Sequence, residues 1–291
     1  MNEKILVTGG MGKTGSRLVE LLRRNGIDYS IAAHRNLNTS EIVYFDWTKP
    51  ATWKAAIEGV SAVYLLAPPL VNHAHKYLID FSRFAISRGV RRFVLLSASL
   101  LPAGGIAQGQ VHQWLMENAV DWAVMSPSWF MQNFSDGQHL PTILSMNKII
   151  SATRDGKVPF ISADDIAAVA FRLLTNKESF NSDFVLTGSR LFSYDEIAKI
   201  ISESSGRNVI HEKVDVETLT SLYKSRGLSD AYAQNLAMMD AAIASGVEER
   251  ITGCVEELIG HPPITFEEFV ASAGSVWIRR VYPLQSISRV G

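Results

Sequence analysis

Cysteine is almost absent from this sequence of 291 residues. The single cysteine, Cys254, cannot form an internal disulfide bond, which favours a reducing compartment such as the cytoplasm. Long hydrophobic runs are also missing, because stretches such as VYLLAPPL and RFVLLSASLL fall well short of the roughly 20 residues that span a bilayer. The N-terminal MNEKILVTGG reads as a strand followed by a turn, so no signal sequence is expected.

An excess of charge of either sign is lacking as well. The 28 Lys and Arg residues and 29 Asp and Glu residues give a net charge of −1. Nucleic acids and anionic membranes are bound by concentrated positive surfaces, so neither is predicted as a partner, and no metal site is predicted. A chain that is 47% hydrophobic is expected to be an ordinary globular protein that binds small molecules.

A glycine-rich turn lies close to the N-terminus, in the stretch VTGGMGKTGS at residues 7 to 16. A triphosphate-binding loop of the Walker type needs a glycine five positions before Gly12-Lys13-Thr14, where this chain has Val7. Gly9, Gly12 and Gly15 instead have the spacing of a dinucleotide-binding turn. The turn residues predicted to bind the cofactor are Thr8, Gly9, Gly10, Gly12, Lys13, Thr14 and Gly15.

Short β-branched and aromatic runs alternate with amphipathic runs along the first half of the chain. Strands are predicted at residues 4–9, 29–34, 42–46, 62–67, 92–98 and 122–127, with the first helix at 13–24. This alternation is typical of βαβ units around a parallel sheet. The predicted fold class is α/β, a Rossmann-type doubly wound parallel sheet with a small, mostly helical C-terminal substrate-binding cap.

The pattern changes after residue 135. Two capping boxes, Ser162-x-x-Asp165 and Ser193-x-x-Glu196, predict helix starts, and a helical block is expected from about 215 to 250 as a cap over the carboxyl edge of the sheet. We therefore predict an NADP(H)-binding domain at 1–135, to which later segments return, and a mixed substrate-binding and cap region at 136–280. Residues 281–291 are expected to form a loose tail.

The end of the second predicted strand indicates the cofactor. An acidic residue there favours NAD, whereas His34-Arg35-Asn36 offers no carboxylate, and Arg35 can bind the additional phosphate of NADPH/NADP+. Asp46, at the end of the third strand, is predicted to meet the adenine amino group or to cap its own loop. The ends of the next two strands are predicted to complete the cofactor site with Ala67, Pro68, Pro69 and Ser97.

The usual proton donor of reductases with this fold is missing. None of the eight tyrosines is followed by lysine at the fourth position, and the helix expected after the fifth strand contains neither residue. His112 on that helix and Ser97 are the catalytic candidates, although His112 is equally compatible with a packing role. Either the protein binds NADP(H) without catalysis, or its substrate needs no proton donor, as an iminium ion does.

An aromatic segment, SPSWFMQNFS at residues 126–135, follows the sixth predicted strand. Its position beyond the carboxyl end of a strand predicts that it lines the substrate site, although aromatic clusters more often form core. Aromatic faces would also attract a cationic indole-type amine. The predicted substrate-binding residues are Ser99, Trp129, Phe130, Met131 and Phe134.

Several of these segments together resemble one family. TGGMGKTG, FDW, APPL, GVRRFVLLSAS, QGQVHQWL, PSWFMQNFS, ISATRDGKVPFISADDIA and MMDAAIASGVEERI are similar to the NmrA-like atypical short-chain dehydrogenases. Within that group they resemble the ergot alkaloid biosynthesis family, which includes agroclavine dehydrogenase and festuclavine synthase. The resemblance, over about residues 4–270, implies NADPH-dependent reduction of an iminium in a tetracyclic indole alkaloid.

Two residues depart from the family pattern, and alternatives stay open. The family usually has Gly-Lys-x-His where this chain has Gln110 before Val111-His112, and Arg where it has Ser126. A neighbouring indole alkaloid, or cyclisation accompanied by hydride transfer, is therefore an alternative substrate or reaction. Two other hypotheses are a non-catalytic NADP(H) sensor that binds a protein partner and a quinone or aldehyde reductase.

Overall fold

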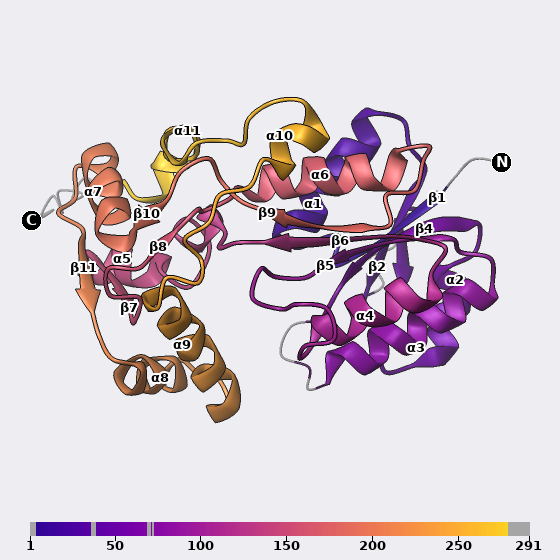
Figure 1. The fold of residues 1–291 in the computed structure, drawn as a ribbon, viewed down its shortest axis with the longest axis horizontal. Helices are drawn as coiled ribbons and strands as arrows, with labels where there is room; N and C mark the ends of the chain where they lie inside the picture. Colours follow the sequence, from indigo (N-terminus) through magenta and orange to yellow (C-terminus); the bar gives the residue numbers. More distant parts are fainter. Residues whose placement is uncertain (1–3, 36–38, 69–70, 72, 279–291) are drawn as a thin grey trace, which may run out of the picture.

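The computed structural model describes residues 4–35, 39–68, 71 and 73–278, and its centre is a parallel sheet of seven strands (Figure 1). The strand order is β3-β2-β1-β4-β5-β6-β9. The strands are β1 (Lys4–Thr8), β2 (Tyr29–Ala33), β3 (Ile42–Tyr44), β4 (Val60–Leu66), β5 (Arg92–Leu96), β6 (Asp121–Pro127) and β9 (Ser182–Leu186). This is the doubly wound arrangement that the sequence predicts.

Helices cover both faces of the sheet. On one face lie α1 (Lys13–Arg24) and α6 (Ala163–Thr175), and on the other lie α2 (Trp53–Ala56), α3 (Ala74–Ser87) and α4 (Gln108–Asn118) (Figure 1). Val94 of β5 packs toward the first layer and Leu95 toward the second, and both are 0% exposed. Central strands buried on both faces are hydrophobic at consecutive positions, which explains runs such as RFVLL.

A smaller C-terminal unit lies beyond the carboxyl edge of the sheet (Figure 1). It contains a parallel pair, β7 (Lys148–Ser151) with β11 (Ile210–Lys213), and an antiparallel pair, β8 (Lys157–Val158) with β10 (Phe192–Ser193). Its helices are α5 (Leu140–Met146), α7 (Tyr194–Ser205), α8 (Val216–Ser225), α9 (Asp230–Ala244) and α11 (Phe266–Ala273). Helix α10 (Cys254–Ile259) packs back on α6, and short 3-10 turns occupy Pro50–Thr52, Met131–Asn133 and Gly274–Val276.

The predicted strands of the first half are confirmed in order, and α1 has the predicted bounds. Strand β9 was not placed by the sequence analysis, although it completes the sheet beside β6. Segments 163–175 and 182–186 thus return to the sheet unit, whereas the predicted tail at 281–291 lies outside the described residues. The division at residues 135 and 136 stays a prediction.

The two predicted capping boxes have different outcomes. Ser193 and Glu196 form the complete box, because each side chain accepts a hydrogen bond from the other residue's backbone N–H. Ser162 also caps its helix, but Asp165 does not close a box: its carboxylate accepts from the backbone N–H of Ile264 at 3.0 Å. Burial raises the pKa of Asp165 to about 6, and its real role is to join α6 to the segment before α11.

The helical block predicted from about residue 215 to 250 is present, and it consists of two helices. Two helices, α8 and α9, are separated by a turn in which Gly227 has a φ of +89°. A positive φ interrupts a right-handed helix and favours glycine, so the break is set by this residue. Small side chains on α9, Ala233 and Ala237, are 0% exposed against α8.

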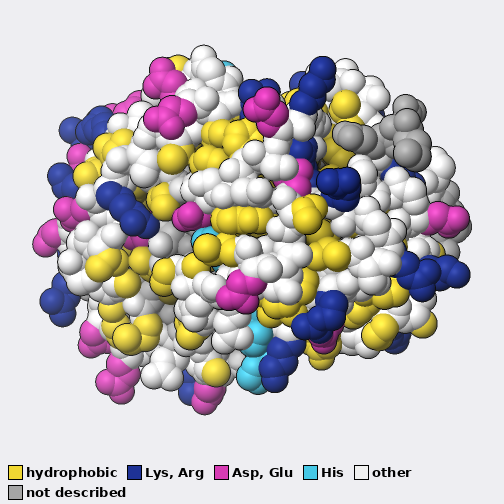
Figure 2. Space-filling view, turned by 45° about the vertical axis from the view of Figure 1, so that its right-hand side comes forward, with side chains coloured by type: hydrophobic (Ala, Val, Ile, Leu, Met, Phe, Trp, Pro, Cys, Tyr) yellow, Lys and Arg dark blue, Asp and Glu magenta, His cyan; other side chains and the backbone are white. Residues whose placement is uncertain are grey.

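Charged side chains of both signs are interspersed with hydrophobic ones on the face shown in Figure 2. This mixture matches the near-zero net charge of the whole sequence. Among the described residues, no helix combines the length and the hydrophobicity needed to cross a membrane.

Candidate functional site

The glycine turn between β1 and α1 is shaped by close backbone contacts. The Gly12 N–H donates to the Gly9 carbonyl at 2.9 Å, and Gly9 has a φ of +66°. A Cβ added at Gly15 would lie 2.2 Å from the Gly9 oxygen, so helix and turn approach as closely as glycine allows. Helix α1 begins with neither a side-chain cap nor an acidic residue in its first turn. Its N-terminal N–H groups are therefore suited to a pyrophosphate.

The position of the Thr14 side chain distinguishes this turn from a triphosphate-binding loop. Its side chain is buried, and its hydroxyl lies 2.9 Å from the phenol oxygen of Tyr64 in β4. In a Walker loop the equivalent hydroxyl would bind magnesium beside the phosphates. Lys13 also points elsewhere, to Asp136 at 3.1 Å. Both side chains thus have partners within the protein, and their contact with the cofactor stays a prediction.

Thr14→Val is expected to destabilise the protein while leaving cofactor affinity nearly unchanged. The substitution leaves the buried Tyr64 hydroxyl without a partner, which costs about 1–3 kcal/mol in the free energy of unfolding. The double variant with Tyr64→Phe should recover much of that loss, because both polar groups are then removed. Thermal unfolding and NADPH titration measure the two effects. Lost binding at unchanged stability would instead assign the Thr14 hydroxyl to the nucleotide.

A cavity of about 570 Å³, called the cofactor cavity below, extends from the glycine turn along the carboxyl ends of β1, β2 and β4. It brings together several residues that the sequence predicts to bind cofactor: Thr8, Gly9, His34, Asp46, Ala67 and Pro68. Gly10 and Gly12 belong to the same turn but do not line it, and the predicted residues Asn36 and Pro69 lie outside the described residues. The carboxyl edge of a parallel sheet is where ligands bind in such folds.

The polar rim of the cofactor cavity is formed by the ends of β2 and β3. Asp46 accepts two hydrogen bonds from Thr48 and lies 3.1 Å from Lys49. The Thr48 hydroxyl and Lys49 lower the pKa of this carboxyl, although burial opposes them. Asp46 therefore caps its own loop, the second of its two predicted roles, and contact with adenine stays a prediction. Arg35 is exposed at the end of β2.

The end of β5 carries the two predicted serines, and they differ in their partners. The Ser97 hydroxyl is buried without a hydrogen-bond partner among the described residues. A buried polar atom of this kind is costly unless a ligand or water satisfies it, so Ser97 suits a ligand contact. The Ser99 hydroxyl instead donates to Glu248 at 2.8 Å, and Arg250 donates to the Ser99 carbonyl. Ser99 thus joins β5 to the segment after α9.

His112 lies inside the sheet unit. It lines neither the cofactor cavity nor the second cavity that is defined below. Its ring is 5.8 Å from that of Trp122, and neither ring nitrogen has a hydrogen-bond partner among the described residues. Burial lowers its pKa, opposed by the carboxylate of Asp183. The packing role left open by the sequence matches this position, and a role in proton transfer stays a prediction.

The aromatic segment after β6 divides into two parts. Met131 and Phe134 are 1% and 0% exposed in the core of the C-terminal unit, where Phe134 contacts Phe160, Tyr194 and Phe266. As fully buried core, they do not offer a surface to a substrate, which corrects the prediction for these two. Trp129 and Phe130 are only partly buried, so their role as pocket lining stays a prediction.

A second cavity of about 550 Å³, called the outer cavity below, lies between the sheet unit and α9. It shares Ala67, Pro68 and Val71 with the cofactor cavity. Its other lining residues come from the start of α3, the start of α4 and from α9: His73, Ala74, His75, Ile106, Ala107, Gln108, Gln110, Ser229, Tyr232 and Asn235. The two cavities thus adjoin each other at the carboxyl edge of the sheet.

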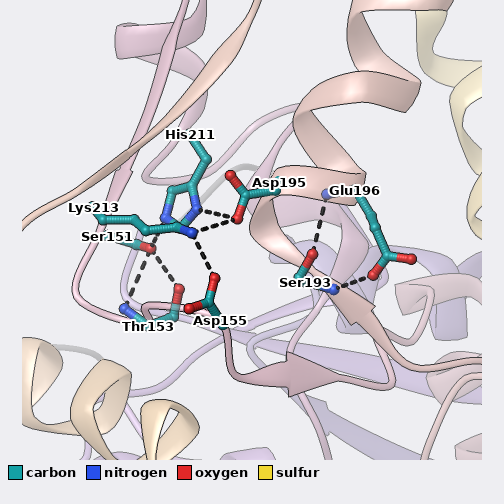
Figure 3. A network of polar contacts seen from close by, with 8 residues as sticks. All are labelled: Ser151, Thr153, Asp155, Ser193, Asp195, Glu196, His211 and Lys213. Atoms are coloured by element: carbon teal, nitrogen blue, oxygen red, sulfur yellow. Dashed lines mark hydrogen bonds and ion pairs between the residues drawn. The ribbon is translucent and has the colours of Figure 1, made fainter.

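A serine, a histidine and an aspartate meet in the C-terminal unit (Figure 3). His211 lies 2.7 Å from the Ser151 hydroxyl and 3.3 Å from Asp195, the order found in hydrolase triads. However, Ser151 is 0% exposed and its hydroxyl also contacts Thr153 at 2.7 Å. Burial lowers the pKa of His211. Since a substrate cannot reach this serine, we interpret the network as a structural link between β7, β11 and α7.

Sequence reasoning missed most of the outer cavity and part of the cofactor cavity. Trp47 and Thr48 line the latter, and the segment FDW after β3 was the available signal. In the outer cavity, Tyr232 and Asn235 are three residues apart on a helix that was predicted only as a cap. Of the two departures from the family pattern, Gln110 lines the outer cavity, whereas Ser126 is buried in β6.

Comparison with known proteins extends over nearly the whole chain. A model of the NmrA-like family matches residues 1–270. Agroclavine dehydrogenase of Claviceps fusiformis is 39% identical over 288 residues, which cover 95% of this chain and 99% of that protein. Festuclavine synthase II of Penicillium roqueforti is 36% identical over 285 residues, with coverage of 94% and 99%. Both alignments thus extend over the segments that form the sheet unit and the C-terminal unit of this chain.

One solved structure illustrates the shared fold. Citrobacter sp. triphenylmethane reductase complexed with NADP(H) has a TM-score of 0.78, is 20% identical, and is matched over 93% of this chain and 99% of its own. At that identity the likeness concerns the fold alone. The doubly wound sheet with an appended C-terminal unit is therefore an arrangement already seen with a nicotinamide cofactor.

Proposed function

Because this chain belongs to the NmrA-like family, as its motifs indicate, we propose that it is an NADPH-dependent oxidoreductase of the atypical short-chain dehydrogenase type. Its proposed reaction is reduction of the C=N bond of an iminium ion in a hydrophobic indole-alkaloid-type substrate. The observation that carries this proposal is the pair of adjoining cavities that share Ala67, Pro68 and Val71. The identity to agroclavine dehydrogenase and festuclavine synthase II supports the substrate class.

The residues at the glycine turn fit a dinucleotide. The uncapped N-terminus of α1 would hold the pyrophosphate, and Arg35 the additional phosphate of NADPH. The unpartnered Ser97 hydroxyl, at the end of β5, would face the nicotinamide half. When bound, the cofactor supplies a hydride. The free Cys254 is compatible with the reducing, cytoplasmic location that we propose.

The substrate explains why the usual proton donor can be absent. The C=N group of an iminium ion is positively charged and its carbon is electrophilic. Hydride addition therefore gives a neutral amine, and no residue has to protonate a developing alkoxide. Helix α4 carries neither Tyr nor Lys, in agreement with such a reaction. The work of the protein is then to orient the two reactants and exclude water, which supplies most of the rate.

Direct hydride transfer is expected when the protein meets a cyclic iminium ion such as a dihydro-β-carbolinium. With NADPH deuterated at the transferred C4 position, the product amine should carry one deuterium at the former iminium carbon. The same reaction with ordinary NADPH in heavy water should leave that carbon free of deuterium. Mass spectrometry of the product, together with loss of NADPH absorbance, measures both.

Three results would contradict this proposal in distinct ways. Reduction of quinones but not of iminium ions would make the protein a quinone reductase. Tight binding of NADPH and NADP+ without any turnover, together with a retained protein partner, would indicate a sensor. Deuterium derived from solvent at the iminium carbon would exclude direct hydride transfer. Gly253→Ala, where an added Cβ would meet only the flexible side chain of Glu257, serves as the active control.

A further inference from the structure

The segment between α9 and α10, residues 245–253, connects the C-terminal unit with the sheet unit (Figure 1). Helix α9 forms one wall of the outer cavity, and α10 packs on α6 beside the sheet. Along this segment, Glu248 forms a hydrogen bond with the turn after β5, Glu249 with β8 and Thr252 with the end of β9. The segment is therefore attached to both units, and its first attachment is to the strand whose end carries Ser97.

Glu248 is buried within this segment. It is 1% exposed, and one of its carboxylate oxygens accepts a hydrogen bond from the Ser99 hydroxyl at 2.8 Å. Arg250 donates to the backbone carbonyl of Ser99 at 3.1 Å, so two residues of the segment hold the same residue of the turn. The Ser99 N–H donates to the carbonyl of Pro127 at 3.0 Å, beside β6. Ser99 is thus held through its hydroxyl, its carbonyl and its N–H group.

A carboxyl group at this buried position is costly for stability. Burial raises the pKa of Glu248, while the Ser99 hydroxyl and the charge of Arg250 oppose that change. A hydrophobic side chain of similar volume often fills a buried position without the cost of removing a charge from water. Stability alone therefore gives little reason for an acid here, whereas a hydrogen-bond acceptor for the turn after β5 gives one.

The turn after β5 lies where the proposed reaction would take place. Ser97, two residues before Ser99, has a buried hydroxyl with no hydrogen-bond partner among the described residues, which suits a contact with the nicotinamide half of the cofactor. Glu248 lines neither the cofactor cavity nor the outer cavity, so it would act through Ser99 and not on a reactant. A shift of about 1 Å in the reacting groups can slow a reaction by about a hundredfold.

We propose that Glu248 is a positioning residue for hydride transfer, which fixes the end of β5 against the cofactor through its hydrogen bond with the Ser99 hydroxyl. The inference rests on the proposed function, since it concerns the same site. The turn requires the hydrogen-bond acceptor of Glu248 and not its charge. Because the segment that carries Glu248 follows α9, the same bond joins the wall of the outer cavity to the end of β5.

Two substitutions of Glu248 separate this hydrogen bond from packing. Glu248→Gln keeps an oxygen that accepts from Ser99, whereas Glu248→Met has a similar volume and only a weak acceptor. In single-turnover reduction of a dihydro-β-carbolinium ion by NADPH, Glu248→Met should slow hydride transfer by about tenfold to a hundredfold, and Glu248→Gln by less than about threefold. The Kd for NADPH should stay within about twofold of the wild-type value in both variants.

Ser99→Ala removes the same hydrogen bond from the other side, at a residue that is only half-buried, and should slow the reaction to a similar extent. It decides the question should Glu248→Met not fold. The double variant Glu248→Met/Ser99→Ala should be no slower than either single variant, because all three lack one and the same bond.

Glu249→Met is the matched control for the segment. Glu249 is exposed, and its carboxylate accepts from the backbone N–H of Lys157 in β8 and not from the turn after β5. Its single-turnover rate should therefore stay within about twofold of the wild-type rate. A loss in Glu249→Met as large as that in Glu248→Met would overturn the positioning role, because any disturbance of the segment would then suffice.

The fluorescence lifetime of bound NADPH gives a second readout that needs no turnover. A dihydronicotinamide ring that is held rigidly emits with a longer lifetime, so Glu248→Met should shorten the lifetime and Glu248→Gln should leave it unchanged. A shortened lifetime in Glu248→Met, with no iminium reduction by wild-type protein, would remove the reductase and leave the positioning role standing. Iminium reduction by Glu248→Met at the wild-type rate, or equal losses in Glu248→Met and Glu248→Gln, would overturn the positioning role and leave the reductase.

Discussion

Gly15→Ala is expected to abolish NADPH binding in any usual concentration range, a loss of at least about a hundredfold in affinity. The added Cβ would lie 2.2 Å from the Gly9 carbonyl oxygen and 2.8 Å from the Cα of Gly10. Real Cβ atoms essentially never approach other atoms within 3.0 Å, and these neighbours are backbone that cannot rotate away. The turn must therefore open, which misaligns the N–H groups of α1. Fluorescence titration with NADPH measures the loss.

Overpacking at this position should also lower the free energy of unfolding by about 1–3 kcal/mol, so folding must be checked separately by circular dichroism and thermal unfolding. Gly12→Ala separates the loss of NADPH binding from the loss of stability. Its Cβ would approach the Gly9 oxygen to 3.2 Å, a much milder contact than that at Gly15, so a smaller loss of stability is expected, while the methyl group would still stand on the turn that we propose holds the pyrophosphate. Gly253→Ala should change neither quantity, because its nearest neighbour is the flexible Glu257 carboxylate.

Normal NADPH affinity in folded Gly15→Ala and Gly12→Ala protein would show that the turn is only a packing feature. The proposed function would then lose its foundation, because the cofactor cavity begins at this turn. If the turn binds the pyrophosphate, the same two variants should also transfer no deuterium from deuterated NADPH to the product. The binding measurement is thereby linked to the reaction.

Arg35→Ala is expected to weaken NADPH binding by about tenfold to a hundredfold while leaving NADH binding nearly unchanged. The guanidinium would make charge-assisted hydrogen bonds to the additional phosphate, and NADH has no such group. Arg35→Lys keeps the charge but loses the two-pronged geometry, so an intermediate affinity is expected. Because Arg35 is exposed, the preference for NADPH should also shrink at high ionic strength.

Arg91 provides the matched control for this charge. It is an exposed arginine that immediately precedes β5, at the amino edge of the sheet, whereas Arg35 follows β2 at the carboxyl edge. Arg91→Ala should leave the preference for NADPH intact. Parallel weakening of NADPH and NADH by Arg35→Ala, or no change in either, would contradict the assignment of the phosphate to this residue.

Much of the sheet unit was determined by local sequence. The first helix has its predicted bounds because Gly12 precedes it and Asn25-Gly26 ends it, and Gly26 has a φ of +65°. Central strands such as β4 and β5 are recognisable because burial on both faces makes them hydrophobic at successive positions. Strand β9 escaped detection because its hydrophobic run is only three residues long, Phe184 to Leu186, and its burial pattern is mixed.

Where a residue had several possible partners, the tertiary structure decided which of them it contacts. Asp165 has the spacing of a capping box, yet it accepts from Ile264, which is distant in sequence. Phe134 and Met131 lie in a segment placed like pocket lining, but packing with Phe160 and Phe266 makes them core. Sequence spacing is the same in both situations, so only the position of distant segments distinguishes them.

The sequence by itself determined the strands of the first half, the glycine spacing of the turn after β1 and the absence of a Tyr–Lys pair, because each depends on neighbours within a few residues. Only the tertiary structure decided which residues form the cavity beside the cofactor cavity. The outer cavity joins His73, Gln110 and Tyr232, which are far apart in the chain and meet only when α9 packs opposite the starts of α3 and α4. The absence of Asp, Glu, Lys and Arg from its described lining is a property of that assembled surface, which no local pattern encodes.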